Sequence, residues 1–300
     1  MSVALVAIVR DEADKVHRMI SSVCGLVDSA FIVDTGSKDG TPEALTEAAR
    51  KNNIELHLTH HKWLNYGFNR THALSLARDK ADWIFELDAD QVAVWHVDLP
   101  GWLESKEADA DGYTISEQED GKVWFRPRLL RGNLDWKYIG PTHEYLEVKD
   151  RVINTMYRES LQIIHHADGA NRADKYRRDV RMLAPGVKQK DPRAIFYTAE
   201  SYRMLGEYKK AMKFYDQRAS MSGYEEEAWY AEYQAGRTCL EYVDAEEGMQ
   251  RLLKAHMRRP TRAEPLATIM HWCSNKLPSA IPHQDTLFIE EPAYRINRSA

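Results

Sequence analysis

The sequence has no long apolar run and few cysteines. No stretch approaches the roughly 20 apolar residues that a membrane-spanning helix needs. The N-terminal apolar run, Val3 to Val9, has no basic segment before it and ends at Arg10, so it does not match a secretory signal peptide. The three cysteines lie far apart and are odd in number, which favours neither a disulfide framework nor a zinc cluster. These absences predict a cytoplasmic protein without a membrane span.

An excess of positive charge is also missing. The 300 residues include 41 Lys and Arg against 46 Asp and Glu, a net charge of -5, so there is no global basic field to attract a nucleic acid. Nucleic acid is therefore disfavoured as the main partner. The hydrophobic fraction of 43% and the charged fraction of 29% are those of a folded globular protein, and the length is sufficient for two domains.

Apolar runs alternate with helical patterns in the N-terminal part of the chain. Alternation of this kind predicts an α/β domain, whose ligand site lies at the carboxyl ends of the strands. The expected strands are Val3–Val9, Ala30–Val33, Ile54–Leu58 and Trp83–Leu87, and the expected helices cover Glu12–Val27, a segment that starts at Thr41, and Thr71–Lys80.

Beyond about residue 170, strand-like runs give way to helical patterns. We expect a catalytic domain over residues 1–168 and an all-α domain over residues 169–300, which is also a candidate surface for oligomer formation. A plain helical bundle would explain this texture, but two sets of small and aromatic residues fit a tetratricopeptide template. The first set is Ala199, Tyr202, Gly206, Tyr208, Ala211 and Tyr215, and the second is Gly236, Ala245, Gly248, Leu252, Ala255 and Pro260.

Two carboxylates follow the last of the expected strands. Asp88 and Asp90 are one residue apart, so both project from the strand end toward the expected crevice. Carboxylate oxygens are hard ligands, and Mg²⁺ or Mn²⁺ typically takes one or two of them together with substrate phosphates. A D-x-D pattern alone often marks a solvated turn, but its position after an apolar strand favours a divalent metal site.

A second strand end carries Asp34, at the start of the glycine-containing turn Asp34 to Thr41. Its carboxylate can accept hydrogen bonds from a nucleobase or a ribose.

Four ordered segments, AIVRDEADKV, FIVDTGSKDGT, FNRTHALSLA and WIFELDADQ, resemble the nucleotide-binding half of family-2 glycosyltransferases of the GT-A fold. The resemblance covers roughly the first 165 residues. It implies a Rossmann-like nucleotide-binding sheet with helices on both faces. It also implies that Asp34 contacts the nucleoside, Arg70 lies near the base or diphosphate, Asp88 holds the ribose or sugar, and Asp90 binds the metal. Many relatives have two adjacent acids where this chain has Asp34 and Thr35, a departure that bears on base recognition.

The segment Gly140 to Tyr145 resembles the acceptor-side loop of these enzymes. By that resemblance, Glu144 is the candidate general base that deprotonates the incoming hydroxyl in an inverting transfer. A surface carboxylate is the alternative for Glu144. His143 is a candidate metal ligand, acceptor contact or packed core imidazole.

His165 and His166 follow another apolar run, Leu161 to Ile164. GT-A enzymes often carry a late histidine that completes the metal site, so His165 is the preferred ligand and His166 the alternative. Arg172 and Lys175 resemble residues at the junction to the repeat domain in some relatives, where they would touch the diphosphate. A solvated helix face is the other interpretation of these two.

The sequence therefore predicts a hexosyltransferase that uses Mn²⁺ or Mg²⁺ and a nucleotide-sugar donor, UDP-linked by preference, with a protein, peptide or glycan as acceptor. A nucleotidyltransferase would also use a carboxylate pair, but residues 7–16 lack its glycine-rich phosphate loop. A non-catalytic scaffold built on the repeat domain is the third alternative.

Overall fold

The computed structural model describes residues 1–105, 109–168 and 174–276. The chain forms two compact units, an α/β unit over Met1–Met182 and a helical unit over Leu183–Ala300. An α/β sheet followed by an all-α region is the fold class that the sequence predicts. The two units divide inside helix α5 (Lys175–Lys188).

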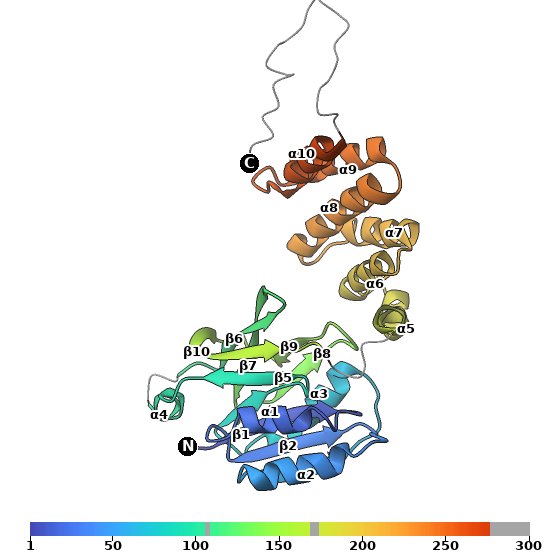
Figure 1. Ribbon diagram of the computed structural model, residues 1–300. Coiled ribbons are helices and arrows are strands. Elements are labelled where there is room, and N and C mark those ends of the chain that lie inside the picture. Colours follow the sequence, from blue (N-terminus) through green and yellow to red (C-terminus); the bar gives the residue numbers. More distant parts are fainter. Residues whose placement is uncertain (106–108, 169–173, 277–300) are drawn as a thin grey trace, which may run out of the picture. The chain divides into compact units, whose positions relative to one another are not determined.

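The first third of the chain builds the parallel part of an eight-stranded sheet (Figure 1). Its strands lie in the order β3-β2-β1-β4 and all run parallel. The four predicted strands are confirmed as β1 (Val3–Val9), β2 (Ser29–Asp34), β3 (Glu55–His60) and β4 (Trp83–Glu86), joined by α1 (Val16–Ser22), α2 (Thr41–Lys51) and α3 (Tyr66–Ala77).

Alternate residues of the central strand enter two different cores, one on each face of the sheet. On β1, Val3 and Leu5 pack into the core that includes α1 and α2, whereas Ala4 and Val6 pack into the core that includes α3. Because both faces are covered, this strand is apolar along nearly its whole length, as expected for a parallel sheet.

The second half of the sheet is mixed, in the order β7-β6-β10-β5 after β4. Strand β7 pairs antiparallel with both β4 and β6, and β10 pairs parallel with β6 and antiparallel with the edge strand β5. Strands β8 and β9 form a separate two-stranded sheet. The bounds are β5 (Gln91–Trp95), α4 (Leu99–Glu104), β6 (Gly112–Glu119), β7 (Lys122–Arg131), β8 (Trp136–Ile139), β9 (Tyr145–Val148) and β10 (Thr155–His165).

Two helices begin at residues other than those predicted. The expected helix from Glu12 starts only at Val16; before it, the Glu12 backbone N–H donates to Thr41 Oγ1 at 2.8 Å, which ties this segment to the start of α2. The helix expected over Thr71–Lys80 starts earlier, at Tyr66, since the Asn65 side chain accepts the Phe68 N–H at 2.8 Å and caps it.

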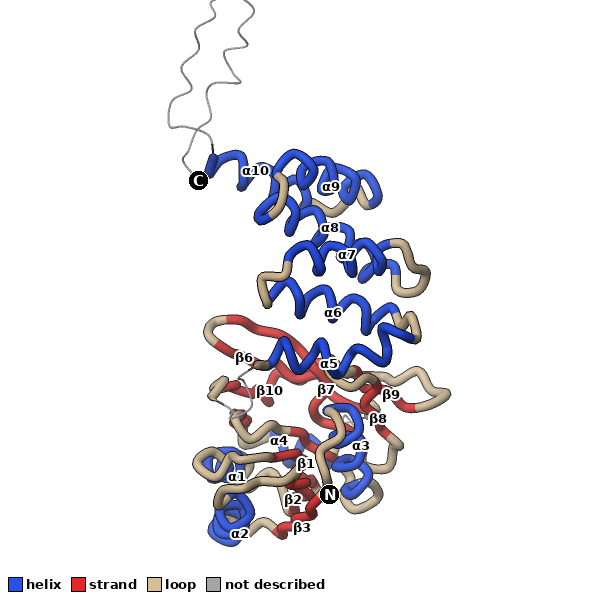
Figure 2. The backbone as a smooth tube through the Cα atoms, turned by 90° about the vertical axis from the view of Figure 1, so that its right-hand side faces the viewer, coloured by secondary structure: helices blue, strands red, loops and turns tan. Residues whose placement is uncertain are grey.

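The helical unit is a succession of helices in which each packs against the next in sequence (Figure 2). Small residues allow the close approach: a Cβ on Gly248 would lie 2.3 Å from the backbone N of Leu240, and Ala199 and Ala211 are fully buried. This arrangement agrees with the predicted helix pairs. After α5, the helices are α6 (Pro192–Met204), α7 (Tyr208–Ala219), α8 (Glu225–Tyr242), α9 (Ala245–Arg258) and α10 (Glu264–Lys276).

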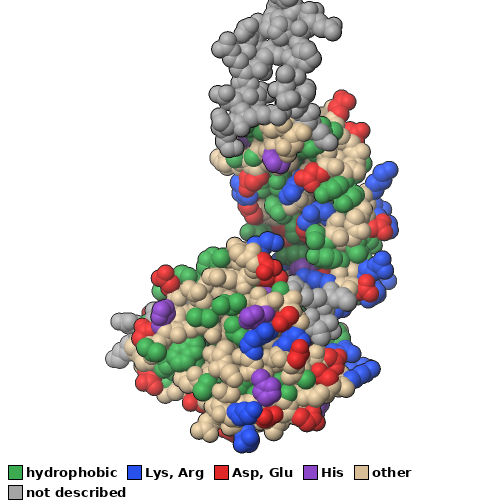
Figure 3. All heavy atoms as spheres, viewed as in Figure 1, with side chains coloured by type: hydrophobic (Ala, Val, Ile, Leu, Met, Phe, Trp, Pro, Cys, Tyr) green, Lys and Arg blue, Asp and Glu red, His purple; other side chains and the backbone are tan. Residues whose placement is uncertain are grey.

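The surface mixes charges of both signs. On the face shown in Figure 3, acidic and basic side chains are interspersed over each unit, in keeping with the small net charge. Among the described helices, none has the length and apolar character that a membrane span requires.

Two glycines, Gly67 and Gly140, allow helix α3 to pack closely against the loop after β8. A Cβ on Gly67, in the first turn of α3, would lie 2.1 Å from the carbonyl oxygen of Gly140, so no larger residue fits there. The Tyr66 N–H donates to the Pro141 carbonyl at 3.0 Å, and the Tyr138 N–H donates to Thr71 Oγ1 at 2.9 Å. Helix α3 is therefore joined directly to the loop that follows β8.

The substitution Gly67→Ala is expected to destabilise the α/β unit by about 1–3 kcal/mol, because the added methyl group must displace the Gly140 carbonyl. Thermal unfolding followed by circular dichroism measures the effect. Gly101→Ala is the matched control, since no heavy atom lies within 4 Å of its ideal Cβ. An equal loss in both variants would contradict the close approach.

Candidate functional site

A cavity of about 610 Å³ opens at the carboxyl ends of the parallel strands. Ile8 and Val9 at the end of β1 line it, and so do Asp88 and Asp90 directly after β4. This is the edge where α/β sheets bind their ligands. All of its lining residues belong to the α/β unit.

Asp90 and His165, 75 residues apart, meet in this cavity. Strand pairing brings them together: Gln91 on β5 is the partner of His165 on β10, and the His166 N–H donates to the Asp90 carbonyl at 2.9 Å. The His165 Nε2 atom lies 3.2 Å from Asp90 Oδ2, and its Nδ1 lies 3.0 Å from Glu119 Oε2. Hydrogen bonding to the Asp90 carboxylate raises the pKa of the His165 imidazole, against the effect of burial.

The Asp90 oxygen and the His165 nitrogen fit one divalent ion. Two neighbouring ligands of an octahedral ion with bonds of about 2.1 Å are about 3.0 Å apart, close to the 3.2 Å observed here. Within residues 1–105, 109–168 and 174–276, no group of three or more His, Cys, Asp or Glu is arranged to hold a metal. An ion at this point would therefore need oxygen ligands from a substrate or from water, as Mg²⁺ commonly does.

Asp88 is held by two buried arginines. Its carboxylate accepts a 2.6 Å hydrogen bond from Arg70 Nη2 and lies 3.5 Å from Arg128 Nη2. Burial alone would raise the pKa of this carboxyl, but the two guanidinium groups outweigh it and hold the pKa well below its usual range. Asp88 is therefore an ionised, fixed acceptor.

Glu117 is the buried counter-ion of the same group. Arg126 and Arg128 each donate to both of its carboxylate oxygens, at distances between 2.5 and 3.3 Å, and Gln91 Nε2 donates at 3.2 Å. Burial would raise the pKa of the Glu117 carboxyl, but Arg128 and Arg126 lower it to about 2.

Glu144 lies at the opposite end of this charge network and lines the cavity. Its Oε1 atom forms an ion pair with Arg70 Nε at 3.0 Å, so the two arginines Arg70 and Arg128 link three carboxylates, those of Glu117, Asp88 and Glu144. The carboxylate of Glu144 is 14% exposed, which leaves it accessible from the cavity.

A further carboxyl lies beneath the network. Glu86 is 2% exposed and its Oε2 accepts a 2.8 Å hydrogen bond from the Tyr138 hydroxyl. Burial raises the pKa of Glu86, which favours the neutral acid.

Asp34 is held inside its own turn. Its Oδ1 accepts the N–H groups of Gly36 and Ser37 at 3.0 and 2.9 Å, its Oδ2 lies 3.2 Å from His60 Nδ1, and the residue is 2% exposed. The neighbouring Thr35 is the residue of this turn that lines the cavity.

The remaining predicted residues occupy different surroundings. His166 is exposed, and His143 lines the cavity with its Nε2 3.6 Å from Oδ2 of the buried Asp179. Lys175 lines the cavity at the start of α5, and Arg172 lies outside the described residues.

Sequence analysis missed Glu117, Glu119 and Asp179. Glu117 and Glu119 alternate on one face of β6 opposite Trp124 of β7, a period-two pattern that could have indicated them. Asp179 has no such signal, because its role depends on how α5 packs.

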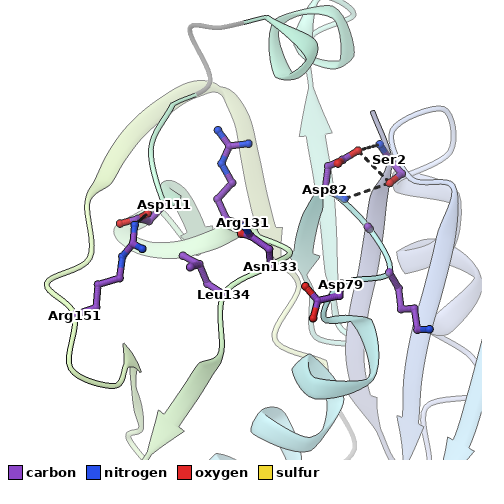
Figure 4. Close-up of a pocket in the computed structure, with 10 residues that line it drawn as sticks. Ser2, Asp79, Asp82, Asp111, Arg131, Asn133, Leu134 and Arg151 are labelled. Carbon is purple, nitrogen blue, oxygen red and sulfur yellow. Dashed lines mark hydrogen bonds and ion pairs between the residues drawn. The ribbon is translucent and has the colours of Figure 1, made fainter.

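A second cleft, of about 540 Å³, lies at the amino ends of β1 and β4 (Figure 4). Within it, Arg151 donates to Asp111, and the Ser2 N–H donates to Asp82. Its position at the amino ends of the strands distinguishes it from the cavity described above.

Comparison with known proteins identifies a family. The sequence model described as Glycosyl transferase family 2 matches residues 4–155, about half of the chain and all four parallel strands. A TPR repeat-containing protein of Synechococcus elongatus is 34% identical over 149 residues, which are 48% of this chain and 35% of that protein. The chain thus spans about a third of the length of the curated relative that it matches.

The solved structures that match are more distant in sequence. TarS 1-349 of S. aureus in complex with UDP is 12% identical, with 95% of each chain covered and a TM-score of 0.42. The mannosyltransferase PcManGT from Pyrobaculum calidifontis, in complex with GDP-Man and Mn²⁺, is 14% identical, with 92% of this chain and 88% of that chain covered and a TM-score of 0.40.

Removal of the buried counter-ion should destabilise the α/β unit strongly. Glu117→Ala leaves Arg128, which is 1% exposed, without its main partner, and the expected loss is about 3–5 kcal/mol in urea unfolding. The exposed pair Arg78–Asp135 is the control, because Asp135→Ala should cost less than about 1 kcal/mol. Equal losses of unfolding free energy in Glu117→Ala and Asp135→Ala would contradict the idea that the buried ion pair contributes more to stability than the exposed one.

The lowered pKa of Glu117 also predicts that the α/β unit becomes less stable in acid. The pKa of Glu117 is about 2 in the folded chain and about 4.3 in an unfolded one, so its stabilising contribution is complete above pH 4.3. That contribution should be lost as the pH falls from about 4.3 toward 2. Urea unfolding of wild type and Glu117→Ala at several pH values should show the difference between them narrowing over this window.

Proposed function

Because the chain belongs to glycosyl transferase family 2, we propose that it transfers a sugar, by preference a hexose from a UDP-linked donor, to an acceptor hydroxyl with the help of a divalent metal. The observation that carries this proposal is the convergence of Asp90 and His165 at the carboxyl edge of the sheet, with Glu144 lining the same cavity. An oxygen and a nitrogen ligand at this spacing suit Mn²⁺, and Mg²⁺ also fits the carboxylate.

Asp90 and His165 would hold the metal ion, which when bound offsets negative charge on the departing diphosphate. Asp88 takes a different role, because Arg70 and Arg128 already neutralise it. Its fixed oxygens suit hydroxyl groups of the ribose or sugar, which can donate hydrogen bonds to it. Arg126 and Lys175 line the cavity as cations and are suited to phosphate oxygens.

The nucleoside end of the cavity lies near the ends of β1 and β2. Thr35 lines the cavity there, and Asp34 fixes the turn that presents it through hydrogen bonds to Gly36 and Ser37. We therefore assign Asp34 a nucleoside-site role that includes holding this turn.

Glu144 is the proposed general base. It would take the proton of the acceptor hydroxyl as that oxygen forms its bond to the anomeric carbon and the bond from this carbon to the diphosphate oxygen breaks. A single displacement of this kind inverts the configuration at the anomeric carbon. The ion pair with Arg70 orients the Glu144 carboxylate toward the cavity without removing its access to it.

The acceptor is proposed to be a protein, a peptide or a glycan. The helical unit supports a macromolecular acceptor, because stacked helix pairs present an extended surface for such a partner. The same unit remains a candidate for oligomer formation.

Donor hydrolysis, in which water replaces the acceptor, tests the proposal. Purified protein with a panel of nucleotide sugars should release nucleoside diphosphate from one donor, and release should stop when the metal is chelated. Asp90→Asn should reduce it by at least about 100-fold, because several kcal/mol of charge stabilisation are lost. Glu144→Gln should reduce it by about 10²–10⁴-fold while leaving the affinity for UDP unchanged.

Asp150→Asn is the matched control, since Asp150 is exposed and its positive φ of 59° is tolerated by asparagine. His165→Ala should weaken Mn²⁺ binding, and His166→Ala should not. Release that persists in Asp90→Asn, or that does not require a divalent ion, would refute the metal-dependent mechanism.

A further inference from the structure

The imidazole of His165 is bound at both nitrogens by carboxylates from different strands. Its Nε2 atom faces Asp90, which follows β4, and its Nδ1 atom faces Glu119, the last residue of β6. The Glu119 contact, at 3.0 Å, is the shorter of the two. Glu119 also lines the cavity and is 24% exposed at its side chain.

Asp90 and Glu119 face different nitrogens of the His165 ring, so a single metal ion cannot bind His165 and both carboxylates. The two ring nitrogens point in different directions, so an ion bound to Nε2 lies on the Asp90 side and away from Glu119. A neutral imidazole carries one N–H, and if this N–H donates to Glu119, the lone pair of Nε2 faces Asp90.

We propose that Glu119 is a positioning residue for the metal site, which orients the His165 ring and fixes the proton on Nδ1 so that Nε2 is the ligand atom. This inference rests on the proposed metal dependence. A carboxylate behind a ligating histidine also increases the basicity of the nitrogen that binds the metal.

The local packing explains how Glu119 reaches the ring. Strand β6 pairs with β10 up to Gln118 and Ile164, one residue before Glu119 and His165, so the two side chains leave neighbouring strand ends on the same face. The ring of Trp124 meets the His165 ring edge-on, with centroids 6.3 Å apart and an interplanar angle of 86°. The imidazole is thus restricted by Trp124 as well as by the two carboxylates.

The first measurement is the affinity for Mn²⁺, with and without UDP, from electron paramagnetic resonance of free Mn²⁺. Glu119→Ala should weaken binding by about 10–100-fold. Glu119→Gln should weaken Mn²⁺ binding less than Glu119→Ala does, because the side-chain amide oxygen can still accept a hydrogen bond from the Nδ1–H of His165. Asp120→Asn, at the adjacent exposed turn with a positive φ of 47°, is the control and should bind as wild type does.

The second measurement needs no metal. Nitrogen-15 spectra of the histidine side chains at alkaline pH, with the His165 signals assigned from a His165→Gln variant, report which ring nitrogen carries the proton. Wild type and Glu119→Gln should show the proton on Nδ1, whereas in Glu119→Ala the proton should move toward Nε2, which faces the Asp90 carboxylate.

The outcomes separate this inference from the proposed function. Wild-type Mn²⁺ affinity in Glu119→Ala, or an unchanged tautomer, overturns the role of Glu119. If Glu119→Gln and Glu119→Ala lose affinity equally and as much as Asp90→Ala, Glu119 is itself a ligand and the positioning role is wrong. If wild type binds no Mn²⁺ but the tautomer changes in Glu119→Ala, the metal dependence fails while the orientation of His165 by Glu119 stands.

Discussion

The buried arginines Arg70 and Arg128 are the constraint on which the α/β unit depends. A guanidinium cannot be neutralised by losing its proton in a protein, so each must be accompanied by carboxylates where it is buried. Glu117, Asp88 and Glu144 supply these charges, and they come from β6, from the segment after β4 and from the loop after Gly140. The need to pair two charges therefore joins segments that are far apart in the sequence.

Because of this pairing, Asp88 and Asp90, the two acidic residues after β4, have different partners. Arg70 and Arg128 hold the Asp88 carboxylate in place, whereas Asp90 meets His165 beside the β5–β10 ladder. Residues one position apart in a D-x-D pattern thus have unlike surroundings, one made of fixed cations and the other of an imidazole. Beneath them, Glu86 accepts a hydrogen bond from Tyr138, and burial raises the pKa of its carboxyl.

Sequence patterns predicted the parallel strands well, because β1 and β4 are buried on both faces and their apolar runs are nearly continuous, and the candidate cavity lies at the carboxyl ends of these strands. They predicted helix starts less well: α3 starts earlier than predicted, where the Asn65 side chain caps it, and α1 starts later than predicted. Glu117 and Glu119 were missed because their partners arrive through long-range strand register. The period-two spacing of Glu117 and Glu119 places both on one face of β6, but it does not show which residues of β7 and β10 lie beside them.

The contact between Gly67 and Gly140 also limits how this protein can diversify. Because only hydrogen fits between α3 and the Gly140 carbonyl, the start of the loop that carries Glu144 cannot move toward α3 without moving the helix. New ligand preferences on this side of the cavity would have to arise by exchange of side chains at its rim, such as Trp63 and Tyr66, on an unchanged backbone.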